Sequence, residues 1–313
     1  MAMQRITVLG GTGFVGSHLV VRLAKIVPEV IVLTRRPQRF RSLNVLSNVH
    51  VQQTDIHDNN ELREALRGSD AVVNLVGILN QTGGNYTFNN AHAELTRRIV
   101  VAANEAGVPR YLHMSALHAD ADNGSSEYLR SKGLGERHLS ELAGDLAWTI
   151  FQPSVIFGPG DSFFNRFGAL LQGLPVFPLA CPDAKLAPVY IGDVCNAMCE
   201  ALDNPDTIGS SIQLCGPSDY TLKQLVEFTR DTLGLSRMVI GLPDFAARAQ
   251  AWMMEFVPGK PFTRDNYQSL QTDNVCSGDC PRQPASIEAV VPTYLGNTGL
   301  RAKQQASREM ARR

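Results

Sequence analysis

A glycine-rich turn between an apolar run and a helical pattern constrains the fold of this chain more than any other feature. Gly10-Gly11-Thr12-Gly13-Phe14-Val15-Gly16 follows the apolar run at residues 5–9 and opens a helical pattern that continues to residue 26. Gly10 permits a tight turn, Gly13 lets backbone amides approach a ligand, and Gly16 lets the helix pack closely on the strand. Because a helix N-terminus carries partial positive charge, this turn predicts a site for the diphosphate of a dinucleotide, lined by Gly10, Thr12, Gly13, Phe14, Val15 and Gly16.

The remainder of the first half alternates buried strands with helices. Apolar runs typical of buried strands occur at residues 5–9, 30–34, 49–53, 71–76, 110–114 and 148–152. Helical spacing of apolar residues occupies 14–26, 60–66, 88–106 and 126–142. This βαβ series predicts an α/β fold of the Rossmann type, a doubly wound parallel sheet with helices on both faces.

The character of the sequence changes after Pro153. Glycine, proline and phenylalanine are frequent in residues 157–182, and shorter elements follow at 189–202, 211–215, 222–233 and 245–256. We therefore predict a dinucleotide-binding domain at 1–155, to which 188–203 returns, and a smaller, less regular substrate or partner lobe at 156–300. Residues 301–313 form a basic tail, which we expect to be a solvated end, with a membrane surface or a partner protein as the alternative.

Composition excludes several classes of protein. A formal net charge of -1 gives no electrostatic reason to expect a nucleic-acid partner. No window reaches the roughly 18 uninterrupted apolar residues of a membrane span. The N-terminal residues run into a strand without a charged leader and apolar segment, so we expect a cytoplasmic protein, at most peripheral to the inner membrane.

The cysteines offer no metal site by their spacing. Six of them lie in the second half without the Cys-x-x-Cys pairs or following histidines of zinc sites, at 181, 195, 199, 215, 276 and 280. We predict reduced thiols in a cytosol-like compartment and no bound metal. Cys276 and Cys280 are the pair that could do more, and we expect them to be unrelated thiols in a loop.

The end of the second strand favours NADP(H) over NAD(H). An acidic residue there would accept hydrogen bonds from the ribose 2′-hydroxyl of NAD(H). This chain instead has Thr34-Arg35-Arg36. Two guanidinium groups suit a 2′-phosphate, because their planar donors bind phosphate oxygens at two points. NADP(H) is preferred, NAD(H) stays the alternative, and solvent-exposed arginines without function are the simpler interpretation.

Tyr128 and Lys132 form the candidate catalytic pair. They are four residues apart on the helix predicted at 126–142, so they share a face, and Ser115 ends the preceding strand at the edge where ligands bind. A phenol ionises near about pH 10, and a nearby ammonium favours the phenolate. Ser115 would polarise a carbonyl, Tyr128 would exchange its proton, and Lys132 would also bind ribose hydroxyls. Such pairs are common on exposed helices, but the position after the fifth strand favours chemistry.

Other residues near this pair are expected to be structural. Gly133 and Gly135 each cost about 1 kcal/mol relative to alanine within a helix, which predicts close packing of that helix. His113 and His118 flank Ser115, and we expect local hydrogen-bond partners rather than catalysts or metal ligands.

These motifs together resemble the extended and atypical short-chain dehydrogenase/reductases, which include proteins similar to the NAD-dependent epimerases and dehydratases. The resemblance covers residues 3 to about 235 and is carried by the glycine turn, Asp55-Ile56, Asn74-Leu75-Val76-Gly77, Asn90, Ser115, the Tyr-x-x-x-Lys pair and Pro153-Ser-Val-Ile-Phe-Gly. Residues 126–132, 157–167 and 189–194 are most similar to the branch that contains the nucleotide-binding accessory subunit of respiratory complex I and its bacterial relatives.

The resemblance implies further site residues. Asp55 and Ile56 would lie at the adenine, Val76 and Gly77 would line the coenzyme together with Asn90, and Pro153 would border the nicotinamide. The interval from Ser115 to Tyr128 is shorter than in sugar-nucleotide members, which disfavours a nucleotide-sugar substrate. Relatives also imply a possible homodimer through the fourth and fifth helices.

Three functions follow from the sequence. The first is an NADP(H)-dependent oxidoreductase acting on a small-molecule carbonyl or alcohol. The second is a non-catalytic NADPH-binding accessory, assembly or redox-sensing protein, associated with respiratory complex I or quinone metabolism. The third is a nucleotide-sugar epimerase or dehydratase, which needs polar groups for a second diphosphate, whereas residues 163–179 are mainly apolar. We expect that segment to be core, with a pocket for an apolar or quinone-related substrate as the alternative.

Overall fold

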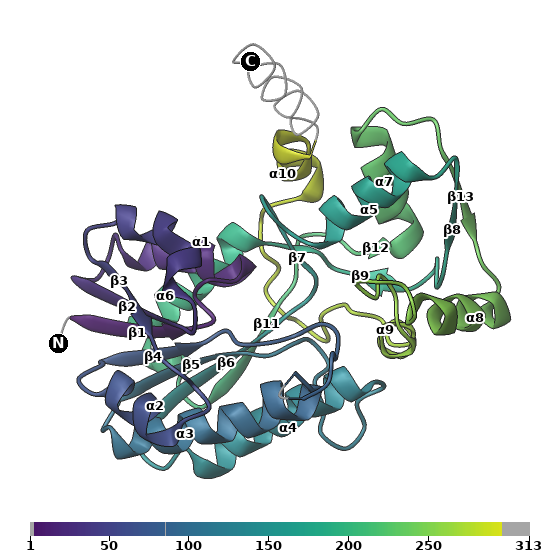
Figure 1. Cartoon of the computed structure of the whole chain (residues 1–313). Coiled ribbons are helices and arrows are strands. Elements are labelled where there is room, and N and C mark those ends of the chain that lie inside the picture. The colour runs from purple at the N-terminus through teal and green to yellow at the C-terminus, as the bar shows by residue number, and fades with distance from the viewer. Residues whose placement is uncertain (1–2, 85, 296–313) are drawn as a thin grey trace. The chain divides into compact units, whose positions relative to one another are not determined.

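The apolar runs of the first half form the strands of one parallel sheet in the computed structural model, which describes residues 3–84 and 86–295. The strand order is β11-β6-β5-β4-β1-β2-β3 (Figure 1), and every neighbouring pair is parallel. The strands are β1 (Arg5–Leu9), β2 (Glu29–Thr34), β3 (Val49–Gln53), β4 (Ala71–Asn74), β5 (Arg110–Met114), β6 (Ala147–Pro153) and β11 (Ser210–Leu214). The predicted Rossmann-type sheet is confirmed, and its order reverses between β1 and β4, where such sheets bind ligands at the carboxyl ends of their strands.

Helices cover both faces of this sheet. Figure 1 shows α2 (Asn59–Leu66), α3 (Leu95–Glu105) and α4 (Glu127–Leu142) on one face, and α1 (Phe14–Leu23) and α6 (Ile191–Asp203) on the other. A buried cluster that includes Leu9, Leu33, Leu62, Ile99 and Leu139 joins the sheet to α2, α3 and α4. Because successive strand residues point to opposite faces, strands buried on both sides need the near-continuous apolar runs seen in the sequence.

Two helices differ from the sequence expectation. The helix expected at 14–26 ends at Leu23, because the chain tightens into a 3₁₀ turn in which Lys25 and Ile26 donate to the carbonyls three residues earlier, ahead of Pro28. The helix expected at 88–106 is divided into a π-helical turn, Asn89–Glu94, and α3. Turns of this kind widen a helix locally and are frequent at functional sites.

Contacts divide the chain into two units. Unit 1 comprises Met1–Pro153 and Val194–Leu214, and unit 2 comprises Ser154–Asp193 and Cys215–Arg313. The basic tail at 301–313 lies outside the described residues. Two 3₁₀ segments, Pro37–Val45 and Pro205–Thr207, belong to unit 1.

Unit 2 is built from small elements around its own core. Its strands pair two by two, β7 (Ile156–Phe157) with β10 (Val189–Tyr190), β9 (Lys185–Leu186) with β12 (Tyr220–Thr221), and β8 (Val176–Leu179) with β13 (Met238–Gly241). Its helices are α5 (Phe163–Gly173), α7 (Leu222–Thr232), α8 (Asp244–Met254), α9 (Arg264–Ser269) and α10 (Ile287–Tyr294). Phe164, Leu171, Phe177 and Leu179 are buried in the core of this unit. Most of the apolar segment at 163–179 is therefore core, as expected.

The cysteines contradict the expectation of reduced, unrelated thiols. Cys215 and Cys276 form a disulfide with an S–S distance of 2.16 Å across 61 residues of sequence. The spacing gave no sign of this pair, because tertiary contacts bring the two together: the Gln283 N–H donates to the Cys215 carbonyl, and Asn274 bridges to Leu186.

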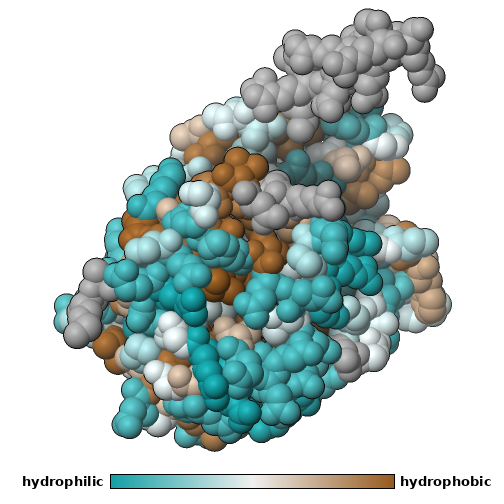
Figure 2. Space-filling view, turned by 60° about the vertical axis from the view of Figure 1, so that its left-hand side comes forward, coloured by the Kyte–Doolittle hydropathy of each residue, from teal (hydrophilic) through white to brown (hydrophobic). Residues whose placement is uncertain are grey.

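Three further observations concern the surface, the helices and metal binding. The face of the molecule in Figure 2 is largely hydrophilic, with hydrophobic residues interspersed. Within residues 3–84 and 86–295, no helix has the length and apolar character needed to cross a membrane. Over the same ranges, no three His, Cys, Asp or Glu side chains converge in a way that could hold a metal ion.

Candidate functional site

The geometry of the turn after β1 requires glycine at positions 10 and 16. Gly10 has φ +75°, and a methyl group there would lie 2.9 Å from the Leu75 carbonyl carbon. A methyl group at Gly16 would lie 2.3 Å from the Gly10 oxygen, which is too close for any side chain. Gly13 donates its N–H to that same oxygen at 3.0 Å, which closes the turn. Residues 10–16 therefore form a compact turn, which we call the cradle, whose edge consists of backbone atoms without side chains.

The N-terminus of α1 fits a diphosphate. No side chain caps the helix at Gly13, and its first turn carries no acidic residue. The first amides of a helix have no partner within the helix, so those of Phe14, Val15 and Gly16 are available to an anion. Side chains in the turn would fill the space that a ligand needs, and no carboxylate competes for the helix N-terminus. These two features suit the diphosphate of a dinucleotide.

Arg35 and Arg36 follow β2 and are both exposed. The Arg35 guanidinium carbon lies 5.4 Å from the centre of the Tyr86 ring, a cation–π distance. In the part of the chain that the structure describes, no salt bridge engages either arginine. Both charges are thus free of carboxylates that would compete with a phosphate.

The residues implied at the adenine and in the fourth helix have local partners. Asp55 is exposed, and its Oδ1 accepts the His57 N–H at 3.0 Å, while Ile56 is half-buried against the core. Asn90 donates its side-chain amide to the Gly84 carbonyl at 3.4 Å. Asn90 therefore stabilises the loop before the π-helical turn.

The segment after β4 lies against Lys132. Asn74 accepts the Val76 N–H on its side-chain oxygen at 3.1 Å, which fixes the backbone where β4 ends. This capping explains why the strand stops at Asn74 and not at the expected residue 76. A methyl group at Gly77 would lie 3.2 Å from the Lys132 Nζ. Gly77, which is predicted to line the coenzyme, thus borders the candidate catalytic lysine.

Helix α4 places Lys132 at the carboxyl end of β5. The Ser126 hydroxyl caps the helix by accepting the Leu129 N–H at 3.1 Å. Lys132 is buried, and its Nζ donates to the carbonyl of Met114, the last residue of β5, at 3.0 Å. The next residue is Ser115, whose buried hydroxyl has no hydrogen bond of good geometry within the described ranges. The structure thus brings Lys132 and Ser115 to one strand end.

Burial sets the electrostatics of this cluster. Burial lowers the pKa of Lys132 to about 8, against the opposing charge of Glu136. Burial also raises the pKa of Glu136, while Ser115, the hydrogen bonds from Gln152 and the charge of Lys132 oppose that rise. Gln152 donates to both Glu136 oxygens, at 3.0 and 2.9 Å. The lysine is therefore poised near neutral pH, where it can gain or lose a proton.

His92 is a site residue that the sequence did not indicate. Its ring lies edge-on to Tyr128, with the ring centres 5.4 Å apart. Its Nε2 accepts the Ile78 N–H at 3.0 Å, and its Nδ1 lies 2.9 Å from the Ser131 hydroxyl, which donates to the Tyr128 carbonyl. Burial, followed by Lys132 and His113, lowers the pKa of His92 to about 2, so the imidazole is neutral.

The sequence held only a weak signal that His92 belongs to the candidate site. His92 lies on the apolar stripe of its helix, four residues after Phe88, where a histidine is most often a core residue with local hydrogen bonds. The π-helical turn that carries it has no recognised sequence signature of its own.

Gly133 and Gly135 confirm the predicted close packing of α4. A methyl group at Gly133 would lie 2.3 Å from the Ala121 nitrogen. A methyl group at Gly135 would lie 2.4 Å from the His92 carbonyl oxygen. The second glycine thus allows α4 to approach the π-helical turn closely enough for His92 to contact Tyr128.

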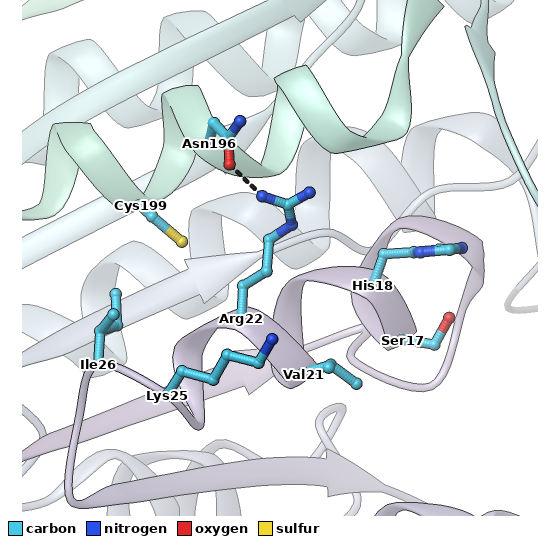
Figure 3. Close-up of a pocket in the computed structure, with 8 residues that line it drawn as sticks. All are labelled: Ser17, His18, Val21, Arg22, Lys25, Ile26, Asn196 and Cys199. Carbon is cyan, nitrogen blue, oxygen red and sulfur yellow. Dashed lines mark hydrogen bonds between the residues drawn. The ribbon is translucent and has the colours of Figure 1, made fainter. Parts of the chain in front are cut away.

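Two cavities lie in unit 1. One, of about 220 Å³, borders the outer part of α4 and is lined by Gln81, Phe88, Asn89, Ala121, Glu127, Arg130, Ser131 and Leu134. The other, of about 670 Å³, lies between α1 and α6 (Figure 3), where Arg22 donates to the Asn196 side chain. Neither cavity is lined by a predicted site residue. The candidate site is therefore placed by the contacts of Lys132 with Met114 and of His92 with Tyr128.

The fold and the cradle define the class: a Rossmann-type α/β protein of the short-chain dehydrogenase/reductase kind. A family model, NAD dependent epimerase/dehydratase family, matches residues 6–215. The chain belongs to this family, and the resemblance found in the sequence is confirmed.

Relatives and solved structures agree with this assignment. The chain is 30% identical over 282 residues to rat NADH dehydrogenase [ubiquinone] 1 alpha subcomplex subunit 9, mitochondrial, covering 88% of this chain and 74% of that protein. It is 26% identical over 239 residues to a ceramide reductase of Caulobacter vibrioides, covering 76% and 74%. The dTDP-glucose 4,6-dehydratase DesIV of Streptomyces venezuelae superposes with a TM-score of 0.71 at 20% identity, covering 93% and 96%. The NADPH-dependent quinone oxidoreductase QOR2 of Escherichia coli gives 0.70 at 21%, covering 87% and 92%, and at these identities both show the fold alone.

Proposed function

We propose that this protein is an NADP(H)-dependent oxidoreductase that interconverts a carbonyl and an alcohol on an apolar substrate. The observation that carries the proposal is the Lys132 Nζ held at 3.0 Å by the Met114 carbonyl, beside the buried Ser115 hydroxyl and on the same helix as Tyr128. A serine, a tyrosine and a lysine at the carboxyl end of one strand can bind a carbonyl oxygen and transfer its proton.

Each residue has one task in this chemistry. A bound nicotinamide coenzyme supplies or accepts the hydride. The buried Ser115 hydroxyl donates to the substrate oxygen. Tyr128 gives the proton to that oxygen during reduction and takes it back during oxidation. Lys132 favours the phenolate by its charge, and its pKa of about 8 lets it pass a proton on near neutral pH.

Arg35 and Arg36 support NADP(H) as the coenzyme. Both are exposed at the end of β2, and Arg35 stacks on Tyr86, which would hold its planar group in place. Guanidinium groups there would bind the 2′-phosphate, and the cradle at Gly10–Gly16 would hold the diphosphate. Asp55, Ile56, Val76, Gly77, Asn90 and Pro153 would complete the coenzyme site.

The similarity to a ceramide reductase supports an apolar substrate, since ceramide is a lipid. We propose unit 2 as the substrate lobe, with the wall of its pocket drawn from its apolar residues. The nucleotide-sugar alternative has less support, because likeness to dehydratases at 20% identity concerns the fold.

Replacing Tyr128 with Phe tests the proposal. We expect Tyr128→Phe to lower kcat by about 10²-fold or more, because the proton donor is lost, while the affinity for NADPH changes little. The assay follows NADPH oxidation with long-chain ketones and short-chain quinones, and a thermal shift reports coenzyme binding. Tyr220→Phe, which removes a phenol in unit 2 that bonds to Glu288, is the matched control. Full turnover by Tyr128→Phe would refute the mechanism.

A non-catalytic role is the second candidate, favoured by the relatives named as complex I subunits, the first of which matches 88% of this chain. In that case NADPH stabilises the protein through mass action and is never consumed. Purification from the native source with respiratory-complex proteins, together with absence of turnover on the whole substrate panel, would favour this role over the oxidoreductase. Turnover that depends on Tyr128 would exclude it.

A further inference from the structure

Three sulfur atoms meet in one loop of unit 2. The Cys276 sulfur is bonded to the Cys215 sulfur, and the Cys280 sulfur lies 2.9 Å from the same Cys276 sulfur. Cys276 is therefore in contact with two cysteines at once, one as its disulfide partner and one as a thiol. The loop Cys276-Ser-Gly-Asp-Cys280 turns back on itself at Gly278, where φ is +66°, a conformation that glycine adopts at little cost.

The two ends of this loop are anchored. At its start, Asn274 donates its N–H to the Lys185 carbonyl at 2.7 Å, and the Ser154 hydroxyl donates to the Asn274 carbonyl at 2.9 Å. At its end, the Gln283 N–H donates to the Cys215 carbonyl at 2.8 Å. These bonds keep Cys276 and Cys280 beside Cys215 without requiring the disulfide itself, so the three cysteines stay together when it breaks.

Exposure distinguishes the three sulfurs. Cys215 is fully buried, at 0% exposure, whereas Cys276 and Cys280 are partly exposed. An external thiol therefore approaches from the side of the loop, and the buried sulfur is the least accessible to it. A thiol that is held in contact with a disulfide can attack it more readily than a reagent that must arrive from solution.

From this geometry we propose that the three cysteines form a thiol–disulfide exchange site in which Cys280 attacks the Cys215–Cys276 disulfide. The Cys280 thiolate bonds to the Cys276 sulfur, the Cys215–Cys276 bond breaks, and Cys215 leaves as a thiolate. The proton that Cys280 lost to water is balanced by the one that Cys215 takes up, because a buried thiolate is costly. One disulfide and one thiol are present before and after, so this step needs no oxidant or reductant.

Reduction of the exposed disulfide completes the cycle. Two molecules of a glutathione-like thiol reduce the Cys276–Cys280 disulfide and become one disulfide themselves, which leaves thiols at Cys215, Cys276 and Cys280. The reverse sequence reforms the buried pair. The ligand class of the site is therefore a small thiol or a protein dithiol.

The charge around Cys280 gives the exchange a pH dependence. Partial burial raises the pKa of the Cys280 thiol, and Arg282 opposes that rise. Arg282 is itself paired with Asp219 at 2.6 Å, and Asp279 precedes Cys280 in the loop. Only the thiolate attacks, so the exchange rate should rise about tenfold for each pH unit below the pKa of Cys280.

Disulfide mapping of the full chain tests the exchange directly. The oxidised protein is held with a low concentration of reduced glutathione, alkylated at intervals and digested with trypsin. The Cys215–Cys276 bond joins two peptides, whereas the Cys276–Cys280 bond lies inside the single peptide 265–282, because cleavage follows Arg264 and Arg282. We expect the internal disulfide to appear before all three cysteines are alkylated. The proposal would be overturned if the two joined peptides were converted directly to peptides with all three cysteines alkylated, with no internal disulfide detected in between. It would also be overturned if Cys215 and Cys276 failed to pair under oxidised glutathione.

A substitution supplies the second measurement. Cys280→Ser should slow the glutathione-driven release of Cys215 by about tenfold or more, because the internal nucleophile is gone. Cys181→Ser, which removes another partly buried thiol of unit 2, should leave the rate unchanged. Should Cys280→Ser fold poorly, Cys280→Ala replaces it, and the mapping of the unaltered chain decides in either case. Equal rates in the unaltered protein and the Cys280 variant would refute the assignment.

Discussion

Two arginines after β2 and one lysine in α4 differ in their surroundings, and exposure or burial sets the chemistry that each side chain can perform. Arg35 and Arg36 are exposed, and the Arg35 guanidinium lies over the Tyr86 ring. Lys132 is buried, with its ammonium on one backbone carbonyl, and burial lowers its pKa to about 8. In the proposed function the exposed cations would serve binding, and the buried cation would serve proton transfer.

The arginines give the prediction at this scale. Replacing both Arg35 and Arg36 with alanine should raise the Kd for NADPH by about 10- to 100-fold, since charged hydrogen bonds of about 1.5–3 kcal/mol are lost. The Kd for NADH, which lacks the 2′-phosphate, should change by less than about twofold. Titration calorimetry measures both. Arg39→Ala, another exposed arginine of the same segment, is the control. Equal loss of both coenzymes would remove the assignment of the 2′-phosphate.

At the scale of elements, the site depends on the contact between α4 and the π-helical turn. The turn carries His92, whose ring contacts Tyr128, and α4 carries Tyr128 and Lys132. Gly135 allows the approach, because any side chain there would meet the His92 carbonyl. The relative position of these two elements therefore sets the position of the candidate proton donor.

Gly135→Ala tests this contact. The added methyl would lie 2.4 Å from backbone, so we expect a loss of about 1–3 kcal/mol in the free energy of unfolding. Urea denaturation measures it. Gly173→Ala in α5, where a methyl would meet nothing within 4 Å, should leave stability unchanged or raise it by less than about 1 kcal/mol. Similar effects of the two substitutions would show that α4 and the turn are not in tight contact.

For the molecule as a whole, buried histidines link stability to pH. Burial, followed by the charge of Lys132, lowers the pKa of His92 to about 2 and that of His113 to about 3, from an ordinary value of 6.5. Below about pH 6.5 the unfolded chain binds a proton at each site, whereas the folded protein does not until pH 2–3. The unfolded state is therefore favoured as the pH falls.

The expected size of this effect is measurable. Between pH 7 and pH 5 each histidine should remove about 2 kcal/mol from the free energy of unfolding. Urea titrations at pH 7 and pH 5 measure the change in the free energy of unfolding, for the unaltered chain and for His113→Asn. We expect this change to be about 2 kcal/mol smaller in the variant. His50→Gln, at an exposed position of β3, controls for loss of an imidazole. An unchanged pH dependence in His113→Asn would contradict the burial argument.

The sequence by itself determined the parallel sheet, the glycine cradle and the helix that carries Tyr128 and Lys132. These rest on local physics: apolar runs need burial on both faces, a tight turn needs Gly10, and residues four apart share a helical face. The early end of α1 was less predictable, because the 3₁₀ turn before Pro28 competes with a continuing apolar pattern. Local signals fix which elements exist better than where they end.

Only the tertiary structure decided the neighbours that long-range packing brings together. His92 reaches Tyr128 because Gly135 admits the turn that carries it, and Cys215 meets Cys276 across 61 residues because hydrogen bonds at Asn274 and Gln283 fix the loop. The segment at 163–179 became core because α5 packs within unit 2. Such contacts depend on the sum of many weak interactions over the whole chain, and no spacing within one segment records them.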